Sequence, residues 1–218
     1  MVSLRLHFVR HGETTASLEG RFCGTTECLL TDDGRLMASY LADRCAAEGD
    51  WLGVYSSPLR RCVETAHQPA ARLGLTVVPE QGLREIDHGA WDGRLEGEVL
   101  RDEPAAYNAW RDHPGSSSAP GGENGYAVAA RAVPVVEAIR AAHAGREGDV
   151  LVVSHKAVIR VVACALLGID VDRYRARLAC PVGSITTLEF ADARDQEARL
   201  LSLADVSYLP TGLRRAPD

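Results

Sequence analysis

Residues 149–168 read DVLVVSHKAVIRVVACALLG and contain two apolar patterns placed end to end. The first, at 150–153, is a continuous run of Val and Leu, which is typical of a strand buried on both faces of a parallel sheet. The second, at 156–167, is long enough for a helix, and Gly168 is a typical residue just past a helix end. A buried strand followed at once by a helix is the repeating unit of an α/β fold.

The same alternation continues along the rest of the chain. Strands are predicted at residues 4–9, 51–57 and 75–80, and helices at 31–47, 58–74 and 123–145. Two further strands, 184–190 and 199–206, are predicted to form a hairpin at the edge of the sheet. We therefore expect one three-layer α/β/α domain over residues 1–218, with an open, mostly parallel sheet and helices on both faces.

One segment departs from this alternation. Between residues 81 and 125, Gly, Pro, Ser and Trp accumulate, with one helix expected around residues 96–110. We interpret the segment as an insertion, and its part at about 91–122 is expected to cover the active site and to form much of the specificity wall. The tail after Tyr208 shows no clear pattern and is expected to be loosely held.

Composition limits the classes of partner and compartment. Hydrophobic residues make up 46% of the 218 and the net charge is −6, which favours a folded protein and argues against nucleic acid or an anionic membrane as partner. The six cysteines contain no C-x-x-C pair, so their spacing gives no zinc or thioredoxin signature, and most of them are expected to be small buried hydrophobes. No signal peptide or membrane span is predicted, so we expect a cytoplasmic protein with reduced thiols, and a homodimer stays open.

Basic and nitrogen-rich side chains follow three of the predicted strands. Arg10 and His11 come directly after the first strand, Arg60 follows the second in SSPLRR, and His155 ends the strand in VVSH. Ligands of open parallel sheets bind at the carboxyl ends of the strands, so these groups are expected to converge. Two arginines suit a phosphate dianion because each guanidinium donates bidentate hydrogen bonds, and two histidines add a nucleophile and a further donor.

At two positions of this expected site, two nearby residues are both candidates for the same role. The missing acid is expected from LREIDHG, where Glu85 is preferred and Asp87 is the alternative. In SSPLRR, Arg60 is taken as the phosphate-binding arginine and Arg61 as its surface neighbour.

Six motifs occur in order over most of the chain: VRHGET, LTDDG, YSSPLRRCVETA, LREIDHGAWDG, PGGEN and VLVVSHKAVIR. Together they resemble the histidine phosphatase superfamily, also called the phosphoglycerate mutase-like family. The resemblance implies that His11 is the nucleophile and forms a phosphohistidine. It implies that Arg10, Arg60 and His155 hold the phosphate oxygens, and that Glu85 protonates the leaving oxygen.

The chain departs from the family pattern at positions near the expected phosphate site. Ser17 stands where the family often has Asn, Glu27 where it has Asp, and Lys156 where it often has Gly. Ser17, Arg21 and Lys156 are candidate substrate contacts, and a solvated surface is the alternative for each of them.

The predicted function is a phosphomonoesterase that acts on a small phosphorylated metabolite, with neither a metal ion nor a cofactor. Within enzymes the alternative is a cofactor-dependent phosphoglycerate mutase, although the family mutases carry a longer insertion and LNERHYG around the acid. In another class, the alternative is a non-catalytic phosphate-binding or interaction module, whose sign would be loss of the nucleophile or the acid. Both residues are present, and the chain has no G-x-x-x-x-G-K-[ST] loop for nucleotide chemistry.

Overall fold

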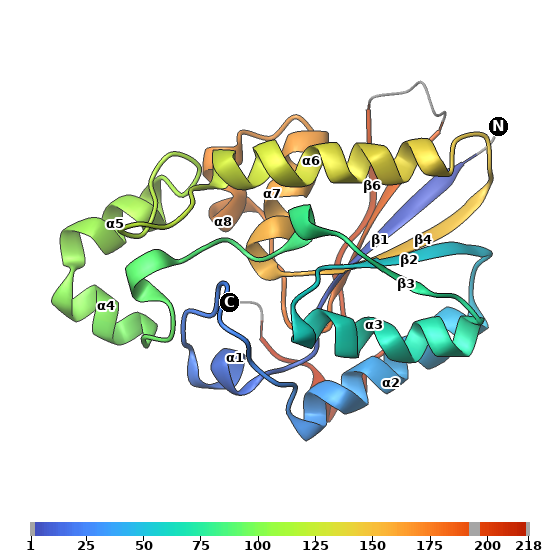
Figure 1. Ribbon diagram of the computed structural model, residues 1–218, viewed down its shortest axis with the longest axis horizontal. Coiled ribbons are helices and arrows are strands. Elements are labelled where there is room, and N and C mark those ends of the chain that lie inside the picture. The colour runs from blue at the N-terminus through green and yellow to red at the C-terminus, as the bar shows by residue number, and fades with distance from the viewer. Residues whose placement is uncertain (1–2, 192–196, 217–218) are drawn as a thin grey trace.

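The computed structural model describes residues 3–191 and 197–216 (Figure 1). These residues form a six-stranded sheet in the order β3-β2-β4-β1-β5-β6. The strands are β1 (Leu4–Arg10), β2 (Trp51–Ser56), β3 (Val77–Pro79), β4 (Gly148–Ser154), β5 (Ile185–Phe190) and β6 (Arg199–Asp205). Strands β1 to β4 pair in parallel, whereas β5 and β6 pair antiparallel at one edge, as the sequence predicted for the hairpin.

Four long helices cover the two faces of the sheet (Figure 1). Helices α2 (Asp32–Ala47) and α3 (Arg60–Leu73) pack on one face, and α6 (Gly125–Ala142) and α7 (Lys156–Leu166) pack on the other. The expected three-layer α/β/α arrangement is therefore confirmed. None of the described helices combines the length and the apolar character that crossing a membrane requires.

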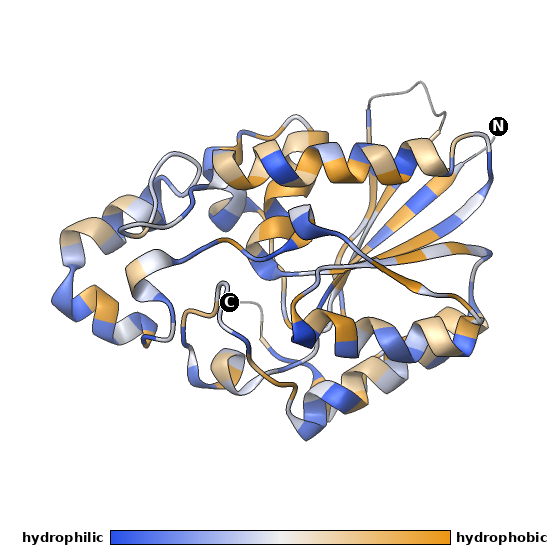
Figure 2. Cartoon of the chain, viewed as in Figure 1, coloured by the Kyte–Doolittle hydropathy of each residue, from blue (hydrophilic) through white to orange (hydrophobic). Residues whose placement is uncertain are grey.

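Strands β1 and β4 form the middle of the sheet, and both are buried. On β1, Leu6 and Phe8 face the helices α6 and α7, whereas Val9 faces α2 and α3. Every residue of β4 is buried, which explains its continuous apolar run (Figure 2). The parallel register pairs Arg10 with Ser154, so the next residue of each strand leaves the sheet beside the other.

The insertion contains two helices where the sequence predicted one. Helix α4 spans Glu96–Asp102 and α5 spans Pro104–Asp112. Proline has no N–H to donate and is favoured at the first turn of a helix, so Pro104 ends one helix and begins the next. The segment has its own apolar cluster, made chiefly of Phe22, Trp91, Val99, Tyr107 and Trp110.

Shorter elements complete the described chain. They are α1 (Thr15–Glu19), α8 (Tyr174–Arg177) and the single 3₁₀ turns η1 (Gln81–Leu83), η2 (Gly89–Trp91), η3 (Val171–Arg173) and η4 (Thr211–Leu213).

Residues 209–216, the described part of the tail, are held against the molecule, so the expectation of a loosely held tail is wrong for them, and residues 217–218 lie outside the described residues. Leu209 and Leu213 are buried in a small apolar cluster. Arg215 donates from Nε to a carboxylate oxygen of Glu13 at 2.6 Å. Two leucines and one arginine suffice to dock this segment, and so few residues produce no periodic pattern that a sequence reading could detect.

Candidate active site

A cleft opens at the carboxyl ends of β1 and β4. Its lining includes six residues that the sequence analysis singled out: Arg10, His11, Ser17, Arg21, Glu85 and Lys156. His155 lies directly beside His11, with ring centroids 5.3 Å apart. The two histidines of the predicted site therefore meet where the register of β1 and β4 brings the strand ends together.

The hydrogen bond of His11 defines which of its ring nitrogens can react. Its Nδ1 lies 2.8 Å from the carbonyl oxygen of Gly12, and a carbonyl can only accept, so Nδ1 carries the proton. Nε2 consequently keeps its lone pair, which is what a nucleophile requires. Burial, and then the charges of Arg61 and Arg10, hold the pKa of His11 well below its ordinary value, so the ring stays neutral at neutral pH.

Gly12 permits a close approach of two backbones behind the nucleophile. A Cβ on Gly12 would lie 2.4 Å from the carbonyl oxygen of Gly34, in the first turn of α2. The Gly12 N–H donates to the hydroxyl of Thr65 on α3 at 3.1 Å. Gly12 thus packs closely against both α2 and α3, which explains why a glycine follows Arg10 and His11.

His155 is also neutral and is fixed in orientation. Its Nδ1 accepts a hydrogen bond from Nε of Arg61 at 3.2 Å, so Nε2 carries the proton and donates to the hydroxyl of Ser57 at 2.7 Å. Burial lowers the pKa of His155 well below its ordinary value, with further contributions from the Arg61 charge and from His11.

Arg61, and not Arg60, enters the cleft, so the expected placement of Arg60 is wrong. The Arg60 side chain is 63% exposed and pairs with Glu64 one turn along α3. Arg61 is 1% exposed, lines the cleft and donates from Nη2 to the carbonyl oxygen of Gly24 at 2.8 Å. Helix α3 begins at Arg60, and its phase turns only the second arginine toward the sheet. Arg61 lies on the same helix stripe as the buried Thr65, one turn along α3.

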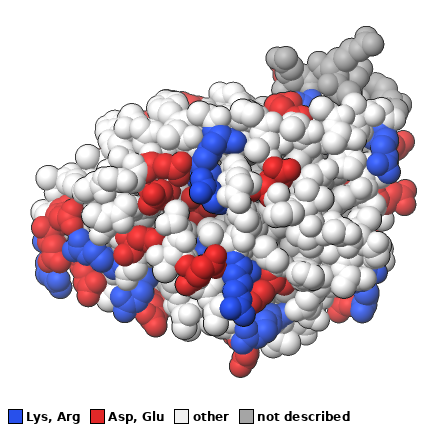
Figure 3. All heavy atoms as spheres, in the orientation of Figure 1, with Lys and Arg blue, Asp and Glu red and all other residues white. Residues whose placement is uncertain are grey.

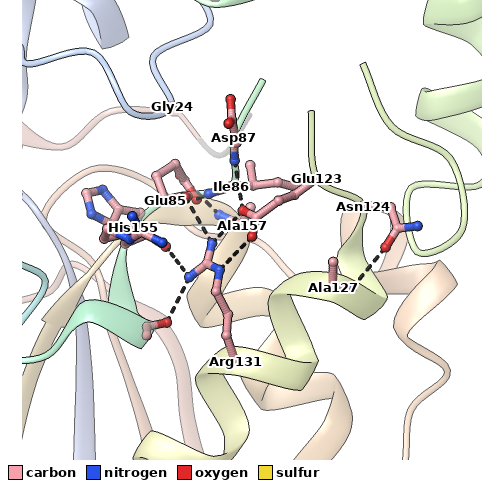
Figure 4. Close-up of polar contacts among 12 residues, drawn as sticks. Gly24, Glu85, Ile86, Asp87, Glu123, Asn124, Ala127, Arg131, His155 and Ala157 are labelled. Carbon is pink, nitrogen blue, oxygen red and sulfur yellow. Dashed lines mark hydrogen bonds and ion pairs between the residues drawn. The ribbon is translucent and has the colours of Figure 1, made fainter. Parts of the chain in front are cut away.

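Glu85 reaches the cleft from the segment after η1. Its Oε1 accepts from the N–H of Ile86 at 2.9 Å, and its Oε2 accepts from the N–H of Ala157 at 3.4 Å (Figure 4). Ala157 belongs to the first turn of α7, so this contact anchors Glu85 beside the start of that helix. Asp87 does not belong to the cleft lining and accepts instead from the N–H of Gly89 at 2.8 Å. Of the two candidate acids, the structure places Glu85 at the site.

Two residues that the sequence analysis did not single out hold this segment in place. Arg131 of α6 donates to the carbonyl oxygens of Gly82, Arg84 and Glu85 at 2.7–3.0 Å. It also forms a two-pronged pair with Glu123, at 2.8 Å for each contact (Figure 4). The motif PGGEN contains Glu123, but a helical arginine such as Arg131 looks like any solvated residue until the fold is known.

Ser17, Arg21 and Lys156 line the cleft, and the side chains of Ser17 and Arg21 are engaged by near neighbours in the chain. The Ser17 hydroxyl accepts from the N–H of Thr14 at 2.9 Å and closes the capping box of α1. Arg21 pairs with Glu19 at 2.5 Å, and Lys156 is the first residue of α7. Glu27 is not part of the lining, and its carboxylate accepts from the N–H of Arg60, the first residue of α3, at 3.1 Å.

The cleft carries an excess of positive charge in a protein whose net charge is −6. Its basic lining residues are Arg10, Arg21, Arg61, Lys156, Arg160 and Arg175, against the acidic Glu85 and Glu96. Elsewhere the signs mix: on the face in Figure 3, acidic and basic side chains are interspersed. Positive charge concentrated in a cleft attracts a small anion. Within residues 3–191 and 197–216, no group of three or more His, Cys, Asp or Glu side chains is placed to hold a metal ion.

We expect the protein to lose stability as the pH falls below about 6.5, the ordinary pKa of histidine. The folded pKa values of His11 and His155 are lowered, so the unfolded chain binds more protons in that range. Each ring contributes up to about 1.4 kcal/mol per pH unit to the loss. Urea unfolding of the wild type and of His11→Asn across this range measures the effect. The variant should lose less stability per pH unit, and parallel curves would contradict the assignment.

The chain was compared with known proteins. The family model of the histidine phosphatase superfamily (branch 1) matches residues 6–203. Phosphoserine phosphatase 1 of Hydrogenobacter thermophilus is 32% identical over 192 residues, which cover 88% of this chain and 89% of that one. Glucosyl-3-phosphoglycerate phosphatase of Mycolicibacterium vanbaalenii is 35% identical over 176 residues, which cover 78% and 77% of the two chains.

A solved structure shares the fold as well. A mycobacterial glucosyl-3-phosphoglycerate phosphatase in complex with inorganic phosphate superposes with a TM-score of 0.83 and 30% identity, over 94% of this chain and 99% of that chain. The family match spans nearly the whole sequence, and the paired histidines lie together at the ends of β1 and β4. The chain belongs to the histidine phosphatase superfamily.

Proposed function

We propose that the protein is a phosphoric monoester hydrolase that acts on a small phosphorylated metabolite through a phosphohistidine at His11. The observation that carries the proposal is the hydrogen bond from Nδ1–H of His11 to the Gly12 carbonyl oxygen. It leaves Nε2 of the neutral ring as the nucleophile in a basic cleft. The relatives that are named phosphatases, and the neighbour solved with inorganic phosphate, support it.

In the first step, Nε2 of His11 attacks phosphorus in line while the bond to the leaving oxygen breaks. Arg10 and Arg61 stabilise the negative charge on the transferring phosphoryl group, as guanidinium groups do in other phosphoryl-transfer sites. Glu85 gives its proton to the leaving oxygen, so the alcohol departs neutral. This charge stabilisation comes from side chains of the protein, and the proposal needs no metal ion.

In the second step, water replaces the alcohol and attacks phospho-His11. Glu85, now a carboxylate, takes a proton from the water, and the N–P bond breaks to release inorganic phosphate and restore His11. Glu85 thus acts first as an acid and then as a base. Microscopic reversibility requires this, because the second step is the chemical reverse of the first with water in place of the alcohol.

We infer that residues 1–218 form a single domain. Its insertion at about 91–122 would select the metabolite. From this segment Glu96 and Trp110 line the cleft. Phosphoserine and glucosyl-3-phosphoglycerate, the compounds in the names of two relatives, are the first substrates to assay. A cytoplasmic setting, where thiols stay reduced, fits the free cysteines.

We predict that Glu85→Gln slows the hydrolysis of alkyl phosphates much more than that of p-nitrophenyl phosphate, whose leaving oxygen needs little protonation. Loss of a general acid typically costs about 10²–10⁴-fold, and most of this should appear with the alkyl substrate. The measurement is kcat for both substrates, with EDTA present. Asp87→Asn is the matched control and should affect both substrates equally and weakly. If the leaving-group dependence follows Asp87 instead, the acid has been assigned wrongly.

A further inference from the structure

Two cysteines face each other in the wall of the cleft. Cys23 and Cys28 both line it, and their sulfur atoms lie 2.7 Å apart. Both are half-buried and free, whereas the other cysteines of the chain, Cys45, Cys62, Cys164 and Cys180, are buried. Most of the cysteines are therefore buried, as the sequence predicted, and this pair is the exception.

The loop that carries the pair is held in a tight turn. The carboxylate of Asp92 accepts from the N–H of Gly24 at 2.6 Å, and from the N–H and the hydroxyl of Thr26 at 3.1 and 2.6 Å. A Cβ on Gly24 would lie 2.6 Å from the carbonyl oxygen of Ile86, so the backbone passes close to the neighbouring segment. These contacts bring the two thiols together across the turn.

The same loop surrounds the guanidinium of Arg61. Arg61 donates from Nη1 to the sulfur of Cys28 at 3.6 Å and to the carbonyl oxygen of Thr26 at 3.1 Å. It donates from Nη2 to the carbonyl oxygen of Cys23 at 3.3 Å. A chemical change at the thiols therefore acts on an arginine of the cleft lining.

The surroundings shift the pKa values of the two thiols in opposite directions. A hydrogen bond from the Cys23 thiol lowers the pKa of Cys28, and the Arg61 charge lowers it further. The same hydrogen bond and burial raise the pKa of Cys23. Cys28, which accepts the hydrogen bond from Arg61, is therefore the sulfur that more readily becomes a thiolate, the reactive form of cysteine, and Cys23 is the adjacent thiol that can resolve its oxidation product.

We propose that Cys23 and Cys28 form a redox-active dithiol that a hydroperoxide converts to a disulfide, and that the oxidised protein is a poorer phosphatase. The Cys28 thiolate attacks the peroxide, whose O–O bond breaks to give a sulfenic acid and, after protonation, water or an alcohol. The Cys23 thiol then attacks the sulfenic sulfur, forming the S–S bond and releasing water. Two thiols are oxidised by two electrons and one peroxide is reduced, and a dithiol reductant reverses the change.

The link to activity runs through Arg61 and rests on the proposed phosphatase function. The disulfide removes the thiolate charge opposite the guanidinium and alters the turn whose carbonyl groups hold it. Arg61 then loses its position over the phosphate site. The thiol chemistry itself does not depend on catalysis and can be measured separately.

The experiment treats the full chain with hydrogen peroxide and follows two readouts. Non-reducing peptide mapping should show a Cys23–Cys28 bond, with the buried cysteines still reduced. Turnover of p-nitrophenyl phosphate should fall by at least about tenfold. This is part of the loss in turnover that follows removal of one group that stabilises the transition state. Dithiothreitol should restore both the free thiols and the activity.

The variants make each part of the proposal refutable. For each variant, the ratio of turnover after and before peroxide is compared. Cys28→Ser should keep a ratio near one under conditions that inactivate the wild type, Cys23→Ser should stop at a Cys28 sulfenic acid that dimedone labels, and Cys45→Ser, the matched control, should behave as the wild type does. Oxidation of other cysteines without the Cys23–Cys28 bond would overturn the site. A bond that forms without loss of turnover would overturn the link to Arg61. A chain that forms the bond but has no phosphatase activity even when reduced would overturn the proposed function and, with it, the claim about activity.

Discussion

Replacing His11 with alanine is expected to reduce phosphatase turnover to background, a loss on the order of 10⁶-fold, as removal of the nucleophile causes in other covalent enzymes. The reason is that Nε2 of His11 is the atom that accepts the phosphoryl group in the proposed reaction. The fold should survive, because the ring makes a single hydrogen bond to the adjacent Gly12 carbonyl.

The measurement uses a phosphomonoester labelled in its phosphoryl group. The wild type should acquire an acid-labile label that leaves as inorganic phosphate in water, and the variant should acquire none. Circular dichroism and urea unfolding verify that the variant is folded. Unchanged turnover in His11→Ala would refute the mechanism. Transfer of the label to a phosphoglycerate faster than its release as phosphate would make the protein a mutase.

The second large effect separates two adjacent arginines. Arg61→Ala should lower kcat by about 10²–10³-fold, which is the cost of removing one preorganised group that stabilises the transition state. Arg60→Ala is the matched control and should stay within about twofold, because an exposed ion pair such as that with Glu64 contributes little.

Arg61 is buried and also holds the loop at Gly24, so its removal carries a structural cost. Arg61→Lys keeps the positive charge but loses the forked donor geometry, and it should remain folded with kcat still clearly reduced. Thermal unfolding of all three variants separates the catalytic from the structural effect. Equal losses in Arg60→Ala and Arg61→Ala would contradict the placement of α3.

The strands and long helices could be predicted because burial leaves a direct mark on the sequence. β4 carries an unbroken apolar run at residues 150–153 since both of its faces are covered, and the helix after it is followed by Gly168. The two histidines could be predicted to meet for a related reason: the carboxyl ends of parallel strands share one edge of the sheet. The break at Pro104 was also visible in the sequence, as a residue that cannot continue a helix.

Features that depend on the phase of a helix or on distant partners could not be predicted in this way. Arg60 and Arg61 differ only in the direction that α3 gives them, and that direction depends on where the helix begins. Arg131 becomes significant only because the 82–85 backbone lies beside α6. Cys23 and Cys28 meet because Asp92, which lies far along the chain, accepts hydrogen bonds from their loop and holds it in a tight turn.

The position of β1 in the sheet has a consequence for how the protein is made. β1 is synthesised first, but its two neighbours, β4 and β5, come from residues 148–154 and 185–190. At a typical 5–20 residues per second, the ribosome exposes this strand for roughly ten seconds before β4 exists. During that time the N–H and C=O groups along its edges and the apolar side chains on its faces lack their native partners and are open to wrong pairing. The nucleophile at the end of β1 meets its partner histidine only when more than two thirds of the chain has emerged.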